Sequence, residues 1–143
     1  MTQEDKELLF KDLCARLPYN VICQVEFKEN GKYNSKVMLL SGIFTDEAYF
    51  TTKGGSIYSN EYKPYLFPLS SMTSEQLFEI QEILGKNEIE IEDGFLSIID
   101  AERNTLTYLE ILAVLEWFNK NHFDYRGLIE KGIAINATNL NIY

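Results

Sequence analysis

The chain has 143 residues, 45% of them apolar, which is the size and composition of one compact domain with a hydrophobic core. Its 22 acidic and 13 basic residues give a formal net charge of −9. This charge disfavours general nucleic-acid binding, because it repels phosphate backbones. The longest apolar stretch, Ile111 to Leu115, is too short to span a bilayer, and the acidic N-terminus lacks the pattern of a signal peptide. We therefore expect a cytoplasmic protein.

A helix is predicted over residues 3–17. Its leucines recur at four-residue spacing and form one apolar stripe. Phe10 and Cys14 are expected beside this stripe, and Asp12 is expected outside it with other charged residues. Pro18 ends the helix, because the residue before a proline avoids the helical conformation.

An antiparallel meander is predicted next. Apolar and polar residues alternate at the start of this region, which is the period of a half-buried strand. Asn30-Gly31 supplies the positive φ angles that a tight hairpin turn requires. The expected strands are residues 21–27, residues 33–44 with a bulge at Gly42, residues 48–52, and a short extended piece around residues 57–58.

An extended segment with two prolines, Lys63 to Thr73, leads into a second predicted helix. Thr73 and Gln76 match a capping box, in which each side chain binds the other residue's free backbone N–H. We expect this helix to continue to Leu84 and to stop at Gly85.

A smaller hairpin is predicted over residues 88–99, with its turn at residues 93–94. Thr107 and Glu110 form another capping box, which opens a third helix that extends to about Asn121. This helix is apolar almost all round. Such a helix is usually central to a fold or partly covered by a partner.

The C-terminal residues predict a short helical turn at 125–131 and an extended tail at 133–143. Ile135, Leu140 and Tyr143 are expected to pin this tail. The whole pattern predicts an α+β fold. Residues 1–143 are expected to form a single domain, in which an antiparallel β-meander packs with about three α-helices and a small extra hairpin.

Histidine and cysteine, which are frequent in zinc sites and catalytic centres, are scarce in this sequence. His122 is the only histidine, and we expect it at the C-terminal end of a helix, where capping is an alternative to catalysis. Cys14 and Cys23 lack metal-site spacing and are expected to be small buried side chains. Glu88 to Glu92 place carboxylates on one strand face, but such a face is most often solvated. No catalytic residue, metal or cofactor is predicted.

Aromatic residues are abundant, with nine Tyr, nine Phe and one Trp. Tyrosine and tryptophan combine a large apolar area with a polar tip, which suits protein interfaces and pockets for flat ligands. Internal packing of a small aromatic-rich domain is the alternative interpretation.

Two stretches carry a resemblance. One is Lys63-Pro64-Tyr65-Leu66, which continues through Pro68 and Ser70-Ser71-Met72-Thr73, and the other is the whole stretch from Trp117 to Gly132. Together they resemble small uncharacterised proteins carried by phages and mobile elements of Bacteroides-type bacteria. The resemblance names no activity. By analogy it implies a protein that works by binding, as small phage-borne proteins often do.

Four hypotheses follow for the function. The leading one is a non-catalytic binding protein of a phage or mobile element, which acts by protein–protein interaction on host defence and self-associates through the helix at 107–121. The second is a sponge that binds a small nucleotide-like signalling molecule. The third is a small hydrolase that uses His122 with Asp124 or Glu130. The fourth is an acidic mimic of DNA, which presents carboxylates in place of phosphates.

The candidate ligand-binding residues come from the two resembling stretches. They are Lys63, Tyr65, Ser70, Ser71, Trp117, His122, Asp124, Tyr125 and Arg126. In a nucleotide site the aromatic members would stack on the base, and the basic members would supply charge. Arg126 has a structural alternative, an ion pair with a carboxylate that ties the tail to the helix at 107–121.

Overall fold

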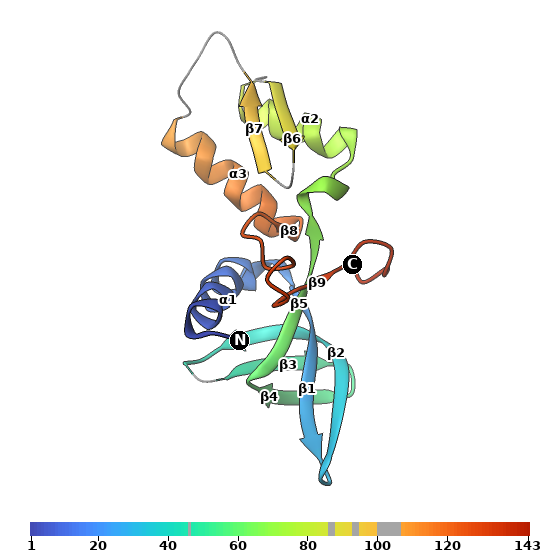
Figure 1. The fold of residues 1–143 in the computed structure, drawn as a ribbon. Helices are drawn as coiled ribbons and strands as arrows, with labels where there is room; N and C mark the ends of the chain where they lie inside the picture. Colours follow the sequence, from blue (N-terminus) through green and yellow to red (C-terminus); the bar gives the residue numbers. More distant parts are fainter. Residues whose placement is uncertain (46, 86–87, 93–94, 100–106) are drawn as a thin grey trace. The chain divides into compact units, whose positions relative to one another are not determined.

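The computed structural model describes residues 1–45, 47–85, 88–92, 95–99 and 107–143 (Figure 1). It confirms the α+β class. Contacts between residues divide the chain into two compact units. The first, Met1–Leu66 with Arg126–Tyr143, contains both chain ends and is called the terminal unit; the second, Phe67–Tyr125, is called the middle unit. That residues 1–143 form one domain stays a prediction.

Helix α1 (Gln3–Arg16) opens the terminal unit with a capping box between Thr2 and Asp5. Its buried face consists of Leu9, Asp12, Leu13 and Arg16, which follow the spacing of one helical side. Phe10 and Cys14 each lie one position beyond a buried leucine, and this rotates them outward, so both are exposed. The predictions that Cys14 is buried and that Asp12 lies outside the apolar face are therefore wrong.

Five consecutive strands form most of the sheet of the terminal unit. They are β1 (Ile22–Glu29), β2 (Lys32–Ile43), β3 (Ala48–Thr52), β4 (Gly55–Ser59) and β5 (Glu61–Pro68). Their order is β4-β3-β2-β1-β5, and all four pairings are antiparallel. The hairpin turn at Asn30-Gly31 has positive φ at both residues, and the register shifts between Leu40 and Gly42, so the predicted turn and bulge are confirmed.

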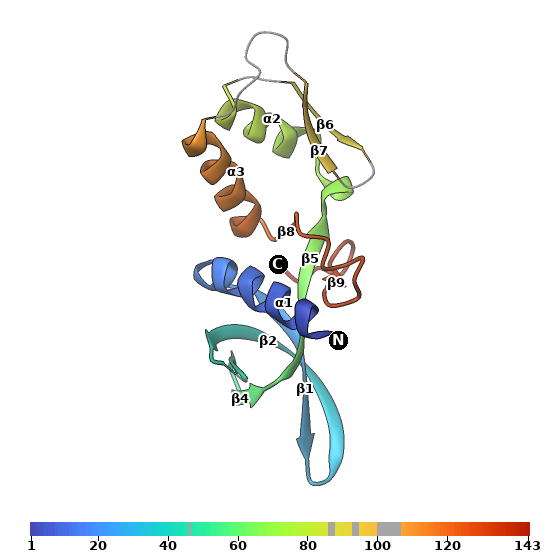
Figure 2. The same ribbon diagram turned by 60° about the vertical axis from the view of Figure 1, so that its left-hand side comes forward.

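One face of this sheet and α1 enclose the core of the terminal unit, as Figure 2 shows for the helix lying beside the strands. The core combines residues of α1 with inward-facing residues of the strands and of the tail. Its fully buried members include Leu13, Val21, Cys23, Val25, Phe50, Leu66 and Leu128. Burial raises the pKa of the Cys23 thiol, as expected for a sulfur surrounded by apolar side chains.

The C-terminal tail returns to the terminal unit. Lys131 N–H donates to the Gly127 carbonyl at 3.2 Å, which closes one helical turn within the predicted segment. Strand β9 (Ile135–Asn136) then pairs with β5 in parallel. Tyr143 is bonded to the sheet, as described below, but Leu140 is 48% exposed. The prediction that Leu140 pins the tail is therefore wrong.

The middle unit contains α2 (Ser74–Ile83), a hairpin of β6 (Glu88–Glu92) and β7 (Phe95–Ile99), α3 (Tyr108–Lys120) and β8 (Phe123–Asp124) (Figure 1). Both predicted capping boxes are present, at Thr73 and at Thr107. Strand β8 pairs with the last residues of β5, from Phe67. The predicted turn at residues 93–94 lies outside the described residues.

A second apolar core holds the middle unit together. It joins residues of α2, α3, β6 and the short 3₁₀ helix at Leu69–Ser71: Leu69, Ile80, Leu84, Ile89, Val114, Phe118 and Phe123. Helix α2 ends as predicted, because Gly85 takes the positive φ of 69° that favours glycine after a helix. Among the described residues, no helix is long and apolar enough to cross a membrane.

Candidate functional site

The nine candidate residues are divided between the two units. Lys63, Tyr65 and Arg126 belong to the terminal unit. The other six, which include Trp117, His122 and Tyr125, belong to the middle unit.

Trp117 and Tyr125 take part in an aromatic cluster of the middle unit. The Trp117 ring stacks on Phe123, with 5.6 Å between ring centroids and an angle of 13°. The Tyr125 ring stacks on Phe118, with 5.6 Å and 24°. Their polar atoms also have internal partners: Trp117 Nε1 donates to Glu79 at 2.8 Å, and Tyr125 Oη donates to Asn119 at 3.1 Å. One face of each ring is therefore occupied by internal packing.

His122 follows the C-terminal end of α3, as the sequence predicts. It is buried and has a positive φ of 60°, the left-handed conformation that commonly ends a helix. Its backbone N–H donates to Asn119, and its carbonyl accepts from Phe67 of β5 at 2.9 Å. Asp124 is buried on β8. The backbone of His122 thus has a structural role, and a catalytic role for its ring stays a prediction.

The two candidate serines lie in the 3₁₀ helix that follows β5. Ser71 Oγ donates to the Pro68 carbonyl at 2.7 Å, which stabilises the turn, and Ser70 is exposed. Lys63 is exposed on β5, where it lines a groove with Gln24 and Lys6. Ligand binding by these residues also stays a prediction.

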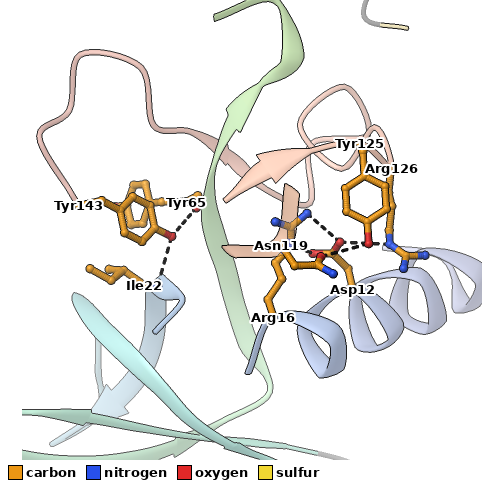
Figure 3. Close-up of polar contacts among 8 residues, drawn as sticks. All are labelled: Asp12, Arg16, Ile22, Tyr65, Asn119, Tyr125, Arg126 and Tyr143. Carbon is orange, nitrogen blue, oxygen red and sulfur yellow. Dashed lines mark hydrogen bonds and ion pairs between the residues drawn. The ribbon is translucent and has the colours of Figure 1, made fainter. Parts of the chain in front are cut away.

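Arg126 belongs to a charge cluster that Figure 3 shows beside α1. Arg16 makes a two-pronged contact with Asp12, at 2.7 Å from Nε and 3.1 Å from Nη2, and both side chains are fully buried. Arg126 Nε lies 3.3 Å from Asp12 Oδ1, and the Arg126 side chain is 30% exposed. Arg126 is therefore a clamp between the tail and α1. That it ties the tail to the helix at 107–121 stays a prediction.

Tyr65 and Tyr143 join the tail to the sheet (Figure 3). The Tyr143 hydroxyl donates to the Tyr65 carbonyl at 2.7 Å and accepts from Ile22 N–H at 3.3 Å. Burial of this hydroxyl raises the pKa of Tyr143, so the group stays a neutral donor. Tyr65 is itself buried, and its hydroxyl donates to Gln24 at 3.3 Å.

Among the described residues of the middle unit, several exposed apolar side chains lie close together at the start of α3. We define the α3 face as Tyr108, Leu109, Ile111 and Leu112. The spacing of these residues places them on one side of the helix, and their exposed fractions lie between 42% and 75%. Side chains of this size and type are usually buried, so an adjoining set on one helix marks a contact surface.

A groove of about 790 Å³ lies on the terminal unit, between β4 and the outer half of the β1–β2 hairpin. We call it the β4 groove. Ser59 closes one end, where its hydroxyl donates to the Glu26 carbonyl at 2.7 Å. Beside it, Phe44, Tyr49 and Tyr58 form an aromatic cluster with centroid distances of 4.8 and 5.9 Å. This groove could not be predicted from the sequence, because its walls come together only through the strand order.

Among the described residues, no group of three or more His, Cys, Asp or Glu side chains has the geometry to hold a metal ion. Comparisons of the chain with protein-family models, curated proteins and solved structures find no match. The α3 face and the β4 groove are the two exposed surfaces that combine apolar or aromatic side chains in the way expected of a binding site.

Proposed function

We propose that this chain is a non-catalytic protein-binding protein that associates through the α3 face, with a second copy of the chain as its partner. The observation that carries the proposal is the exposure of four large apolar side chains on one side of α3. In a two-fold symmetric interface both copies contribute the same four residues, so the apolar area buried is twice that of one α3 face.

Two features of α3 favour it as a docking element. Its start is fixed by the capping box, in which Thr107 Oγ1 accepts from Glu110 N–H at 3.2 Å and Glu110 accepts from Thr107 N–H at 2.8 Å. Its opposite side is anchored in the core of the middle unit by Val114 and Phe118. The exposed side chains are thus presented on a rigid support, which lowers the entropy lost on binding.

Native mass spectrometry of two matched variants tests this proposal. Full burial of a leucine contributes about 1.5–3 kcal/mol, so Leu112→Glu should weaken association by more than about tenfold. Leu140→Glu is the control, because Leu140 has a similar exposed fraction, 48% against 44%, and the charge change is the same. We expect a two-copy mass for the wild type and for Leu140→Glu, and a one-copy mass for Leu112→Glu.

Equal masses for all three proteins would contradict the proposal. A small extra mass that disappears on denaturation would instead favour the nucleotide-sponge hypothesis. In that hypothesis a base would have to displace Phe123 and Phe118 from Trp117 and Tyr125, or stack on the ring faces opposite them. The association with phages and host defence is proposed on the sequence resemblance alone.

A further inference from the structure

We propose that the β4 groove binds an extended, basic segment of a partner protein, which adds to the sheet as a strand alongside β4. This surface belongs to the terminal unit, so the inference is independent of the association proposed for α3. Its basis is a combination of free strand edge, acidic lining and exposed aromatic rings in one groove.

The backbone of β4 offers hydrogen-bonding groups to the groove. A two-residue loop joins Thr52 and Gly55, and such loops connect a hydrogen-bonded pair. Because hydrogen bonding alternates along an antiparallel pair, Gly55, Ile57 and Ser59 bond to β3, whereas the N–H and C=O groups of Ser56 and Tyr58 point away from it. These groups are placed to pair with an added strand.

Strand β1, which forms the wall of the groove opposite β4, also has backbone groups that face the groove. The same alternation along β1 directs the backbone groups of Glu26 and Lys28 away from β2. Two hydrogen bonds agree with this alternation. The carbonyl of Val21, an odd-numbered residue, accepts from Leu40 N–H, and the carbonyl of Glu26, an even-numbered residue, accepts from the Ser59 hydroxyl on the groove side. Strand β5 begins at Glu61, which pairs with Glu26, so β5 does not cover Lys28.

The side chains that line the β4 groove carry a net negative charge, which favours a basic partner. The groove is lined by four carboxylates, from Glu26, Glu29, Glu47 and Glu61, and by two ammonium groups, from Lys28 and Lys36, which leaves a net charge of −2. Both lysines lie over aromatic rings, Lys28 at 5.7 Å from the Tyr33 centroid and Lys36 at 5.1 Å from that of Phe27. No ion pair of the described residues involves these four carboxylates.

Side chains of the added strand would alternate between two environments. On one face lies Ile57, which packs against the core of the terminal unit, and on the other lies Tyr58 with Phe44 and Tyr49. Apolar residues suit the first face, and lysine or arginine suits the exposed rings of the second through cation–π contacts. A second copy of this chain is a poor occupant, because it carries a net charge of −9.

Titration calorimetry with a synthetic peptide tests the inference. The probe is the capped peptide Lys-Val-Lys-Val-Lys-Val-Lys, and two matched peptides serve as controls. In one, glutamate replaces lysine; in the other, alternate backbone nitrogens are methylated on the edge that would face β4. We expect the probe to bind, the acidic peptide not to bind, and the methylated peptide to bind roughly tenfold or more weakly.

Two charge-reversal variants of the protein distinguish the effect of the groove's charge from the effect of the chain's net charge. Glu29→Lys should weaken binding of the probe roughly fivefold, whereas Glu82→Lys, an exposed position in the middle unit with the same charge change, should alter it less than about twofold. Ser56→Pro removes one groove-facing N–H and should weaken binding about tenfold. Where Ser56→Pro does not fold, the comparison of Glu29→Lys with Glu82→Lys decides.

Three results would overturn the inference. They are absence of binding by the probe, equal binding of the methylated and unmethylated peptides, and equal effects of Glu29→Lys and Glu82→Lys. A two-copy mass that Ser56→Pro abolishes would also overturn it, since the edge of β4 would then be occupied by a second copy.

Discussion

Asp12 is a fully buried carboxylate that lies between two guanidinium groups on α1 and the tail. A charge without solvent is stable only when it is paired, and here the two contacts from Arg16 and the one from Arg126 replace the lost water. Removal of the carboxylate would remove both contacts that the buried Arg16 makes with Asp12 and the contact that joins Arg126 of the tail to α1.

Asp12→Asn should lower the free energy of unfolding by about 3–5 kcal/mol, because it removes the negative charge that pairs with the buried guanidinium group of Arg16. Chemical denaturation measures the change. Glu7→Gln, an exposed position on the same helix, should change it by less than about 0.5 kcal/mol. The double variant Asp12→Leu with Arg16→Met removes both buried charges and should recover most of the stability; a double variant as unstable as the single one would contradict this account.

The sequence contains a pattern for this cluster, but the pattern does not distinguish a buried ion pair from an exposed one. Asp12 and Arg16 are four residues apart, the spacing of an ion pair on a helix surface, and such pairs are usually solvated. The spacing does not show that the fold buries this pair or that Arg126 of the tail lies beside Asp12, because both depend on contacts between distant residues.

Elements whose signals are local could be predicted from the sequence. The capping boxes at Thr73 and Thr107, the turn at Asn30-Gly31 and the bulge at Gly42 each depend on a few neighbouring residues. Strand order depends on contacts between distant residues and leaves no local pattern. The pairing of β1 with β5, and hence the β4 groove, could not be predicted for this reason.

At the scale of elements, the Tyr143 hydroxyl adds two hydrogen bonds to the pairing of β9 with β5 that joins the tail to the sheet. Tyr143→Phe removes its bonds to Tyr65 and Ile22 and should lower the free energy of unfolding by about 1–2 kcal/mol. Tyr33→Phe is the matched control, because Tyr33 is 74% exposed. Thermal or chemical unfolding of the two variants measures the difference, and equal stabilities would show that the tail is held by its apolar contacts instead.

At the scale of the whole molecule, the net charge of −9 opposes association of two copies. Apolar burial at the α3 face has to exceed this repulsion, so salt that screens the charges should strengthen the association. Binding of a basic peptide in the β4 groove should respond in the opposite way, because salt screens attraction there. The two proposed surfaces can thus be told apart by the sign of their salt dependence.

Sedimentation equilibrium over a range of protein concentrations, at low and at high salt, tests the central claim most directly. The account predicts that the weight-average mass rises from 16.6 kDa toward twice that value with concentration, and that it rises at lower concentration when salt is added. A mass that stays at 16.6 kDa at every concentration and in both salt conditions would contradict self-association through the α3 face.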